Sequence, residues 1–151
     1  MKTIIAIYGR KDEGKSETIK NVCRLLLSNF PNSIPSIPIR EINYNSDILL
    51  TIKLGSILIG IESQGDPNSR MINDDTVKDL ANQNCDIIVC ATRTGGMTVA
   101  KVDNIALNNN NPFRVIWKSS YFNSGCNNDV LNYICAEEII NLIKSIIITQ
   151  V

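Results

Sequence analysis

The chain contains no histidine among its 151 residues. This absence excludes Ser-His and Cys-His nucleophilic catalysis as they are usually built, together with zinc sites that use imidazole ligands. Any chemistry must therefore use lysine, arginine, carboxylates, hydroxyls, backbone amides or a bound hard cation.

Other features that the sequence lacks narrow the class of protein further. Lys plus Arg and Asp plus Glu both total 15, so no net positive charge draws in a nucleic-acid backbone. No stretch approaches the roughly 18 uninterrupted apolar residues of a membrane span, and the charges from Arg10 onward follow the first apolar run too soon for a secretory leader. The five cysteines form no CxxC pair, which is typical of reduced, buried thiols. We therefore expect a cytoplasmic protein that binds neither nucleic acid nor a membrane.

Strand patterns and helix patterns alternate along the whole chain. Short β-branched or apolar runs predict strands over 3–8, 47–54, 56–63, 86–92 and 113–118. Apolar residues at helical spacing predict a first helix that ends before Pro31 and further helices over 73–83, 99–107 and 129–146. Asn73 is expected to cap the helix over 73–83. Gly55 between two of the strands indicates a hairpin, and 108–111 reads as a polar loop. The sequence therefore predicts one domain over 1–151, a three-layer α/β fold whose sheet is mostly parallel with one antiparallel hairpin strand.

A glycine-rich motif joins the first predicted strand to the first predicted helix. The run Gly9-Arg10-Lys11-Asp12-Glu13-Gly14-Lys15-Ser16 matches GxxxxGK[ST] at every fixed position. The glycines let the backbone curl so that successive N–H groups face inward at the positive end of the helix, which forms a cup for an anion. Lys15 is expected to contact the β- and γ-phosphates of a nucleotide, and the Ser16 hydroxyl to ligate a bridging Mg²⁺. With Glu17, which follows directly, these residues make up the predicted nucleotide site.

The segment GRKDEGKS after IIAIY resembles the Walker A motif of the P-loop NTPase superfamily, and the similarity is specific over residues 4–27. The resemblance implies a P-loop NTPase-like fold and gives the family's phosphate and magnesium roles to Gly9, Gly14, Lys15 and Ser16. The sequence has no guanine-selecting NKxD motif, so ATP is the expected nucleotide, with GTP as the alternative.

A magnesium site of this kind usually needs an acidic group at the end of a neighbouring buried strand. Glu62 ends one such strand and Asp66 follows in the loop, and either carboxylate fits the role. Ser63 and Gln64 in the same segment can orient an attacking water or an acceptor, although both are also ordinary residues of a polar turn.

Arg93 follows another predicted strand and is placed to stabilise charge on a transferring phosphoryl group. The alternative is a surface arginine in a flexible turn. Lys118 with Ser119 and Ser120 lies where related folds often contact the base or ribose, and it equally fits a solvated lysine. Trp117 and Tyr121 can stack on a base or belong to the core.

Two functions fit these predictions. The first is a small Mg²⁺-dependent phosphotransferase or NTPase that uses Lys15, Asp66 and Arg93 and, as a kinase, takes a small-molecule phosphate acceptor. The second is a non-catalytic nucleotide-binding module that passes its state to a protein partner, for example through a loop that the γ-phosphate orders.

Overall fold

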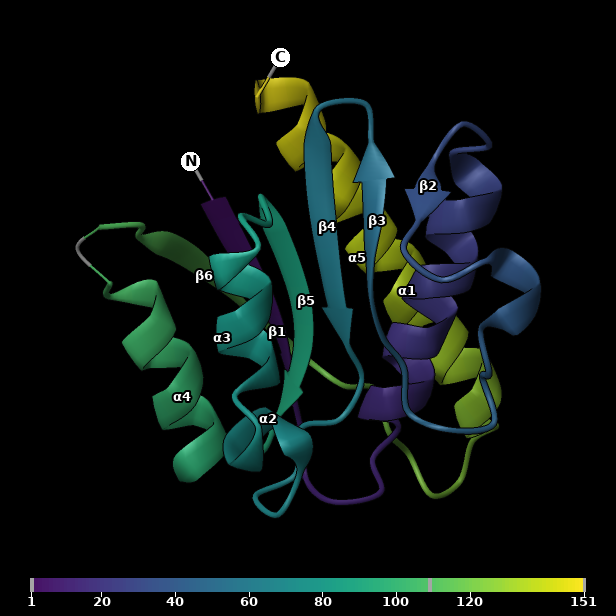
Figure 1. Cartoon of the computed structure of the whole chain (residues 1–151). Coiled ribbons are helices and arrows are strands. Elements are labelled where there is room, and N and C mark those ends of the chain that lie inside the picture. Colours follow the sequence, from purple (N-terminus) through teal and green to yellow (C-terminus); the bar gives the residue numbers. More distant parts are fainter. Residues whose placement is uncertain (1, 109, 151) are drawn as a thin grey trace.

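A six-stranded mixed sheet forms the centre of the molecule, in a computed structural model that describes residues 2–108 and 110–150 (Figure 1). The strands are β1 (Lys2–Tyr8), β2 (Ile34–Pro35), β3 (Leu49–Leu54), β4 (Ile57–Glu62), β5 (Ile87–Thr92) and β6 (Phe113–Ser119). The helices are α1 (Lys15–Asn29), the 3-10 turn η1 (Ile39–Glu41), α2 (Arg70–Asn73), α3 (Thr76–Asn82), α4 (Met97–Ala106) and α5 (Asn128–Gln150).

The strand order is β2-β3-β4-β5-β1-β6. β4, β5, β1 and β6 run parallel, whereas β3 runs antiparallel to both of its neighbours. Gly55, with a φ of 59°, forms part of the tight turn between β3 and β4. The predicted α/β class is therefore confirmed, with a mostly parallel sheet and an antiparallel hairpin.

Helices cover both faces of the sheet because successive side chains of each strand point to opposite sides. Ile5 and Ile7 of β1 pack with α1 and α5, whereas Ile4 and Ala6 of the same strand pack with α2, α3 and α4. This explains why β1 and β5 read as continuous apolar runs in the sequence: both of their faces are buried. No helix within the described residues is both long and apolar enough to cross a membrane.

The helix predicted over 73–83 begins later than expected and follows a separate helical turn. The sequence predicted a single helix over 73–83 capped by Asn73, but Asn73 is the last residue of α2 and α3 begins at Thr76. Asp75 between them has a left-handed backbone with φ of 52°, which interrupts the helical hydrogen-bond ladder. The predicted helix is therefore confirmed over Thr76–Asn82, but the cap was wrong, because Asp75 and not Asn73 precedes it. The short helix α2 before it was not predicted.

The carboxyl ends of the four parallel strands meet at one rim of the sheet, which is where α/β proteins bind their ligands. Because β3 runs the other way, it begins at this rim instead of ending there. The loop after β1, the segment before β3 and the loops after β4, β5 and β6 therefore surround one space.

Part of the predicted polar loop 108–111 lies outside the described residues, which omit 109.

Candidate functional site

The loop between β1 and α1 adopts a curled backbone that only certain residues accept. The Gly9 amide donates to the Thr92 carbonyl at 3.3 Å, which fixes the start of the loop to the end of β5. Asp12 and Gly14 have left-handed φ values of 61° and 82°. A Cβ on Gly14 would lie 2.2 Å from the Asn132 Oδ1 atom, so glycine is required here both by its conformation and by its neighbour.

Backbone amides at the start of α1 are open. Gly14 caps the helix without a side-chain hydrogen bond, and within the described chain no acceptor faces the amides of Gly14, Lys15 or Ser16. These are the N–H groups that a helix start leaves without partners, and they lie at the positive end of its dipole. By contrast, the Arg10 amide is already bonded to the Glu13 carboxylate at 3.1 Å. An anion would therefore bind at the α1 end of the loop.

The Lys15 side chain folds back over the loop. Its Nζ donates to the Gly9 carbonyl at 2.8 Å, and the residue is only 7% exposed. Burial lowers the pKa of Lys15 below its usual value; nearby Arg93 lowers it further, and Asp66 opposes the shift. A single described hydrogen bond uses one of the three ammonium donors, so the others are available to a ligand.

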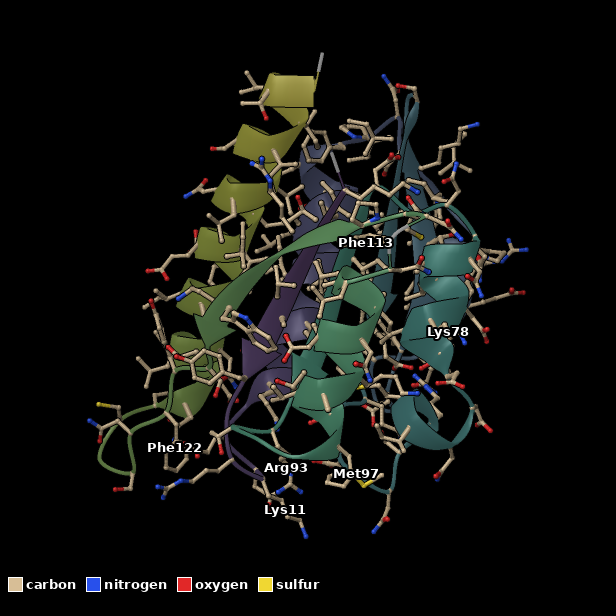
Figure 2. The ribbon with its side chains drawn as sticks, turned by 90° about the vertical axis from the view of Figure 1, so that its left-hand side faces the viewer. Lys11, Lys78, Arg93, Met97, Phe113 and Phe122 are labelled. Atoms are coloured by element: carbon tan, nitrogen blue, oxygen red, sulfur yellow. The ribbon has the colours of Figure 1, made fainter. Side chains whose placement is uncertain are left out.

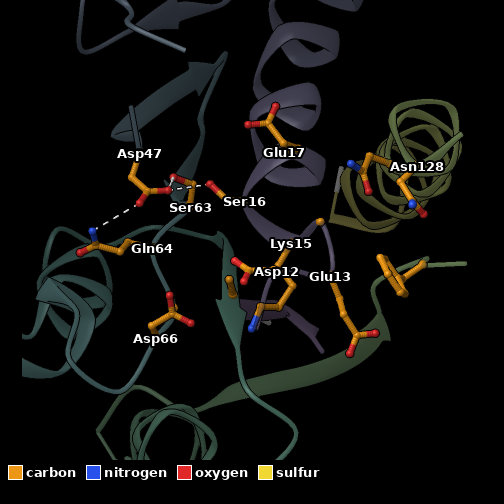
Figure 3. A pocket seen from close by; sticks show the side chains of 15 residues that line it. Asp12, Glu13, Lys15, Ser16, Glu17, Asp47, Ser63, Gln64, Asp66 and Asn128 are labelled. Atoms are coloured by element: carbon orange, nitrogen blue, oxygen red, sulfur yellow. Dashed lines mark hydrogen bonds between the residues drawn. The ribbon is translucent and has the colours of Figure 1, made fainter. Parts of the chain in front are cut away.

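A carboxylate that the sequence analysis did not single out meets the Ser16 hydroxyl. Ser16 Oγ donates to Asp47 Oδ1 at 2.6 Å, Ser63 Oγ donates to the same oxygen at 2.7 Å, and Gln64 Nε2 donates to Oδ2 at 3.3 Å (Figure 3). Burial opposes ionisation of Asp47, but these three hydrogen bonds and the charge of Lys20 outweigh it, so its pKa lies below the usual value. An ionised carboxylate only accepts, so the Ser16 proton points toward Asp47 and the Ser16 lone pairs remain for a cation.

The direction of β3 explains how Asp47 reaches the site. Asp47 and Ile48 directly precede β3, and the Ile48 amide donates to Ser63 Oγ at 2.8 Å, just beyond the end of β4. The predicted acidic groups, Glu62 and Asp66, both follow a strand, whereas Asp47 precedes one. A carboxylate directly before the antiparallel strand of a predicted hairpin is the sequence feature that would have indicated Asp47.

Glu62, one of the two predicted metal ligands, is turned into the protein. It is 0% exposed and does not line the cavity. Its carboxylate accepts from Arg70 Nε at 2.9 Å, Arg70 Nη2 at 2.8 Å and Thr76 Oγ1 at 2.6 Å. These bonds join the end of β4 to the first residues of α2 and α3.

Asp66 and Arg93 are brought together at the other side of the cup. Asp66 lines the cavity, and Arg93 Nε donates to its Oδ1 at 2.8 Å. Gly65 lets the Asp66 loop approach the end of β5, because a Cβ there would lie 2.1 Å from the Ala91 carbonyl oxygen. Lys11 and Arg93 lie at the same end of the molecule (Figure 2).

Residues 12–17, Asp47 and residues 63–66 line a cavity of about 420 Å³. Its far wall comes from Phe122, Asn128 and Asn132, at and before the start of α5. Asn132 is 5% exposed, and its Oδ1 has no hydrogen-bond partner among the described residues. The described part of the chain holds no cluster of three or more Cys, Asp or Glu side chains able to ligate a metal by themselves.

The residues at the end of β6 and directly after it differ from the expectation for a base site. Lys118 Nζ donates to the Tyr121 hydroxyl at 2.8 Å and pairs with Glu138 at 2.9 Å. Neither Lys118, Ser119, Ser120 nor Tyr121 lines the cavity, and Trp117 lines a separate hollow with Tyr8. These contacts hold β6 and its loop against α5.

Comparison of the chain with protein-family models, with curated proteins and with solved structures finds no match. The residues and the geometry of this cavity are therefore the basis for a proposed function.

Proposed function

We propose that the chain is a P-loop protein that binds ATP with Mg²⁺ and transfers or hydrolyses the γ-phosphate. One observation carries this proposal: the open amides at the start of α1, the buried Lys15 ammonium and the Ser16 hydroxyl all converge on one cavity. Amides at a helix start bind anions, and a neighbouring hydroxyl with free lone pairs suits a hard cation.

The order of the strands also supports this proposal. β1, which carries the loop, lies between two parallel strands, and helices cover both faces of the sheet. The loop therefore opens one strand in from the β6 edge of the sheet, at the rim where groups from four other segments reach the ligand. A P-loop NTPase-like three-layer arrangement accounts for each of these features.

The residues of the cup would divide the binding between them. Lys15 would bind the β- and γ-phosphate oxygens with the donors that Gly9 does not use. Ser16 would ligate Mg²⁺, and Asp47 would hold the hydroxyl proton away from the cation and accept from its water shell. Bound Mg²⁺ would neutralise charge that develops on the phosphates. Asp47 replaces Glu62 in this scheme because Glu62 is committed to Arg70.

Asp66 and Arg93 are the candidates for the chemical step. Asp66 would accept the proton of a water or of an acceptor hydroxyl, and Arg93 would position it through their 2.8 Å ion pair. If the pair opens, the Arg93 guanidinium can turn to the transferring phosphoryl group. Phe122, Asn128 and Asn132 would contact the nucleoside, since they form the wall of the cavity beyond the loop.

Calorimetry with Mg²⁺ and ATP tests the proposal. Wild-type protein should bind at millimolar ligand or below, and Lys15→Ala should lose at least about tenfold in affinity because a charge-assisted contact is removed. Lys53→Ala is the matched control, since Lys53 is an exposed lysine of β3 outside the predicted site and its side chain has no described partner. Absence of binding to the wild type, or equal binding by Lys15→Ala, would contradict the proposal. GTP and phosphate release are measured in parallel.

One observation favours the alternative of a non-catalytic nucleotide-binding module. The Gln64 side chain, a candidate for orienting water, uses its carbonyl on the Arg70 amide and its amino group on Asp47. Stoichiometric nucleotide binding without phosphate release or transfer to any of a panel of small acceptors would support the module.

A further inference from the structure

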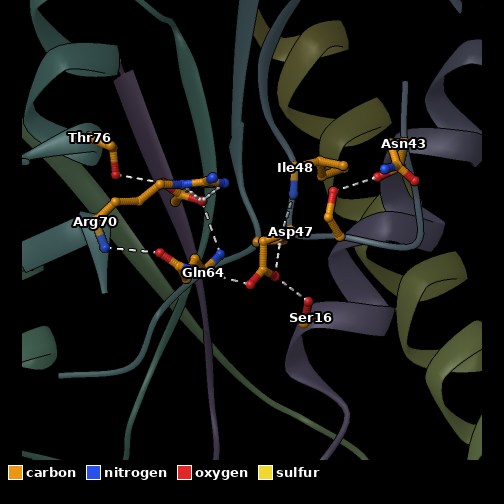
Figure 4. Close-up of polar contacts among 10 residues, drawn as sticks. Ser16, Asn43, Asp47, Ile48, Gln64, Arg70 and Thr76 are labelled. Atoms are coloured by element: carbon orange, nitrogen blue, oxygen red, sulfur yellow. Dashed lines mark hydrogen bonds and ion pairs between the residues drawn. The ribbon is translucent and has the colours of Figure 1, made fainter. Parts of the chain in front are cut away.

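The Gln64 side chain bridges Asp47, just before β3, and the backbone of the first residue of α2. Its Nε2 donates to Asp47 Oδ2 at 3.3 Å, on the metal side of the cup, and its Oε1 accepts from the Arg70 amide at 2.9 Å, at the start of α2 (Figure 4). A carboxamide is planar, with its donor and acceptor held in fixed relation. A rotation that satisfies one end must therefore re-aim the other.

The start of α2 depends on few other contacts. α2 is a single turn, and only Met71 is fully buried in it. The first residue, Arg70, is held at its backbone by Gln64 and at its guanidinium by Glu62. Thr76, the first residue of α3, donates to the same Glu62 carboxylate. A change at Gln64 therefore acts on a segment with little independent stability.

We propose that Gln64 is a positioning residue that ties the carboxylate of Asp47 to the first turn of α2, so that occupancy of the metal side of the cup changes the stability of residues 70–76. A ligand that fixes Asp47 favours the arrangement in which the whole Asp47–Gln64–Arg70 chain of hydrogen bonds is made. The part of this inference that concerns nucleotide depends on the proposed function, whereas the connection between Asp47 and α2 does not.

Hydrogen exchange of the Arg70 amide in the ligand-free protein tests the connection. Gln64→Met removes the acceptor, so exchange should become about fivefold faster, the factor expected for loss of one ordinary hydrogen bond. Asp47→Asn should also speed exchange, because an amide that still accepts from both serines turns its amino group toward that of Gln64. In the Gln64→Met background, Asp47→Asn should add nothing.

A donor–acceptor exchange distinguishes positioning from a general loss of stability. Asp47→Asn combined with Gln64→Glu again pairs a donor with an acceptor and keeps an oxygen for the Arg70 amide, so exchange should return toward the wild-type rate. Gln83→Met and Asp103→Asn are the controls, since both side chains are exposed and have no described partner. The connection is refuted if Asp47→Asn leaves the Arg70 amide unchanged, or if its effect is the same with and without Gln64.

Addition of Mg²⁺ and ATP then tests the effect of occupancy. At 100 times the dissociation constant, exchange should slow across residues 70–76, by at most the roughly 100-fold that such an excess can impose. Slowing at residues 14–18 alone would overturn this effect and leave the proposed function standing. No slowing in either segment would count against the proposed function, and the ligand-free result would still decide the connection.

Discussion

At the scale of single residues, Gly14 shows how the loop and the far wall of the cavity constrain each other. Its left-handed φ of 82° lets the chain enter α1, and its missing side chain leaves room for the side-chain Oδ1 atom of Asn132. Asn132 lies on α5, so the shape of the cup is set partly by a residue 118 positions further along the chain.

Gly14→Ala should therefore lower the free energy of unfolding by about 2–4 kcal/mol, from left-handed strain and from the contact with Asn132. Urea denaturation measures the change. Gly14→Ala combined with Asn132→Ala should recover the contact part and retain about 1–2 kcal/mol of strain. Gly95→Ala is the control, because no atom lies within 4 Å of its Cβ position and its φ is not positive. A Gly14→Ala protein as stable as this control would contradict the argument.

At the scale of elements, the Glu62 carboxylate holds three of them together. It ends β4, and it binds the first residue of α2 and the first residue of α3. Because it is fully buried, its charge depends on Arg70 for compensation.

Removal of the Arg70 charge alone should accordingly lower the free energy of unfolding more than removal of the Arg70 and Glu62 charges together. Arg70→Met leaves an unpaired buried carboxylate and should lower the unfolding free energy by about 3 kcal/mol, whereas Arg70→Met with Glu62→Gln should recover part of that loss. Chemical denaturation at pH 7 measures both variants. Arg114→Met, at an exposed arginine of β6 with no described partner, should change stability little. If the double variant is the less stable of the two, the charge is not what Arg70 compensates.

Most elements were predictable from the sequence, because their patterns are local. The predicted strands 3–8, 86–92 and 113–118 agree with β1, β5 and β6 to within one residue at either end, since buried apolar runs need no knowledge of their neighbours. The start of α3 at Thr76 was not predictable, because the left-handed backbone of Asp75 leaves no trace in apolar spacing, and the single turn α2 before it was missed. β2 was also missed, because its two residues are too short for any period.

The candidate site was predictable only in part. The loop and the start of α1 are local in the chain, and the motif located them. Asp47 was missed because its approach to Ser16 depends on the strand order and on the direction of β3, which a local pattern does not contain. The partners of Glu62 and Asp66 depend on side-chain packing, so the choice between these carboxylates needed the structure.

At the scale of the whole molecule, the solvent exposure of the cysteine thiols shows how well the packed interior is shielded from solvent. Cys23, Cys85, Cys90 and Cys135 are buried, and Cys126 is exposed in the loop before α5. Burial raises the pKa of Cys85 to about 11 and that of Cys90 to about 12, which keeps both as unreactive thiols at neutral pH.

Native protein should therefore react with a thiol reagent at one position, and the other four thiols should react only after unfolding. Titration with Ellman's reagent with and without guanidinium counts them. Cys126→Ser should abolish the fast reaction without altering the slow one. Fast modification of any thiol in the native Cys126→Ser variant would show that the core opens more readily than its packing indicates.

Because β3 runs antiparallel to β4, the end of the β3–β4 hairpin that lies beside the candidate site is opposite the end that carries its turn. Leu49 pairs with Glu62 beside the site, whereas Leu54 pairs with Ile57 at the far end, where no atom lies within 4 Å of a Cβ on Gly55. The intervening ladder fixes the spacing of Asp47 and Ser63 regardless of what is attached beyond it. The Gly55–Ser56 turn is thus a natural point at which to graft a fluorescent label or an affinity peptide and follow the protein without disturbing its cavity.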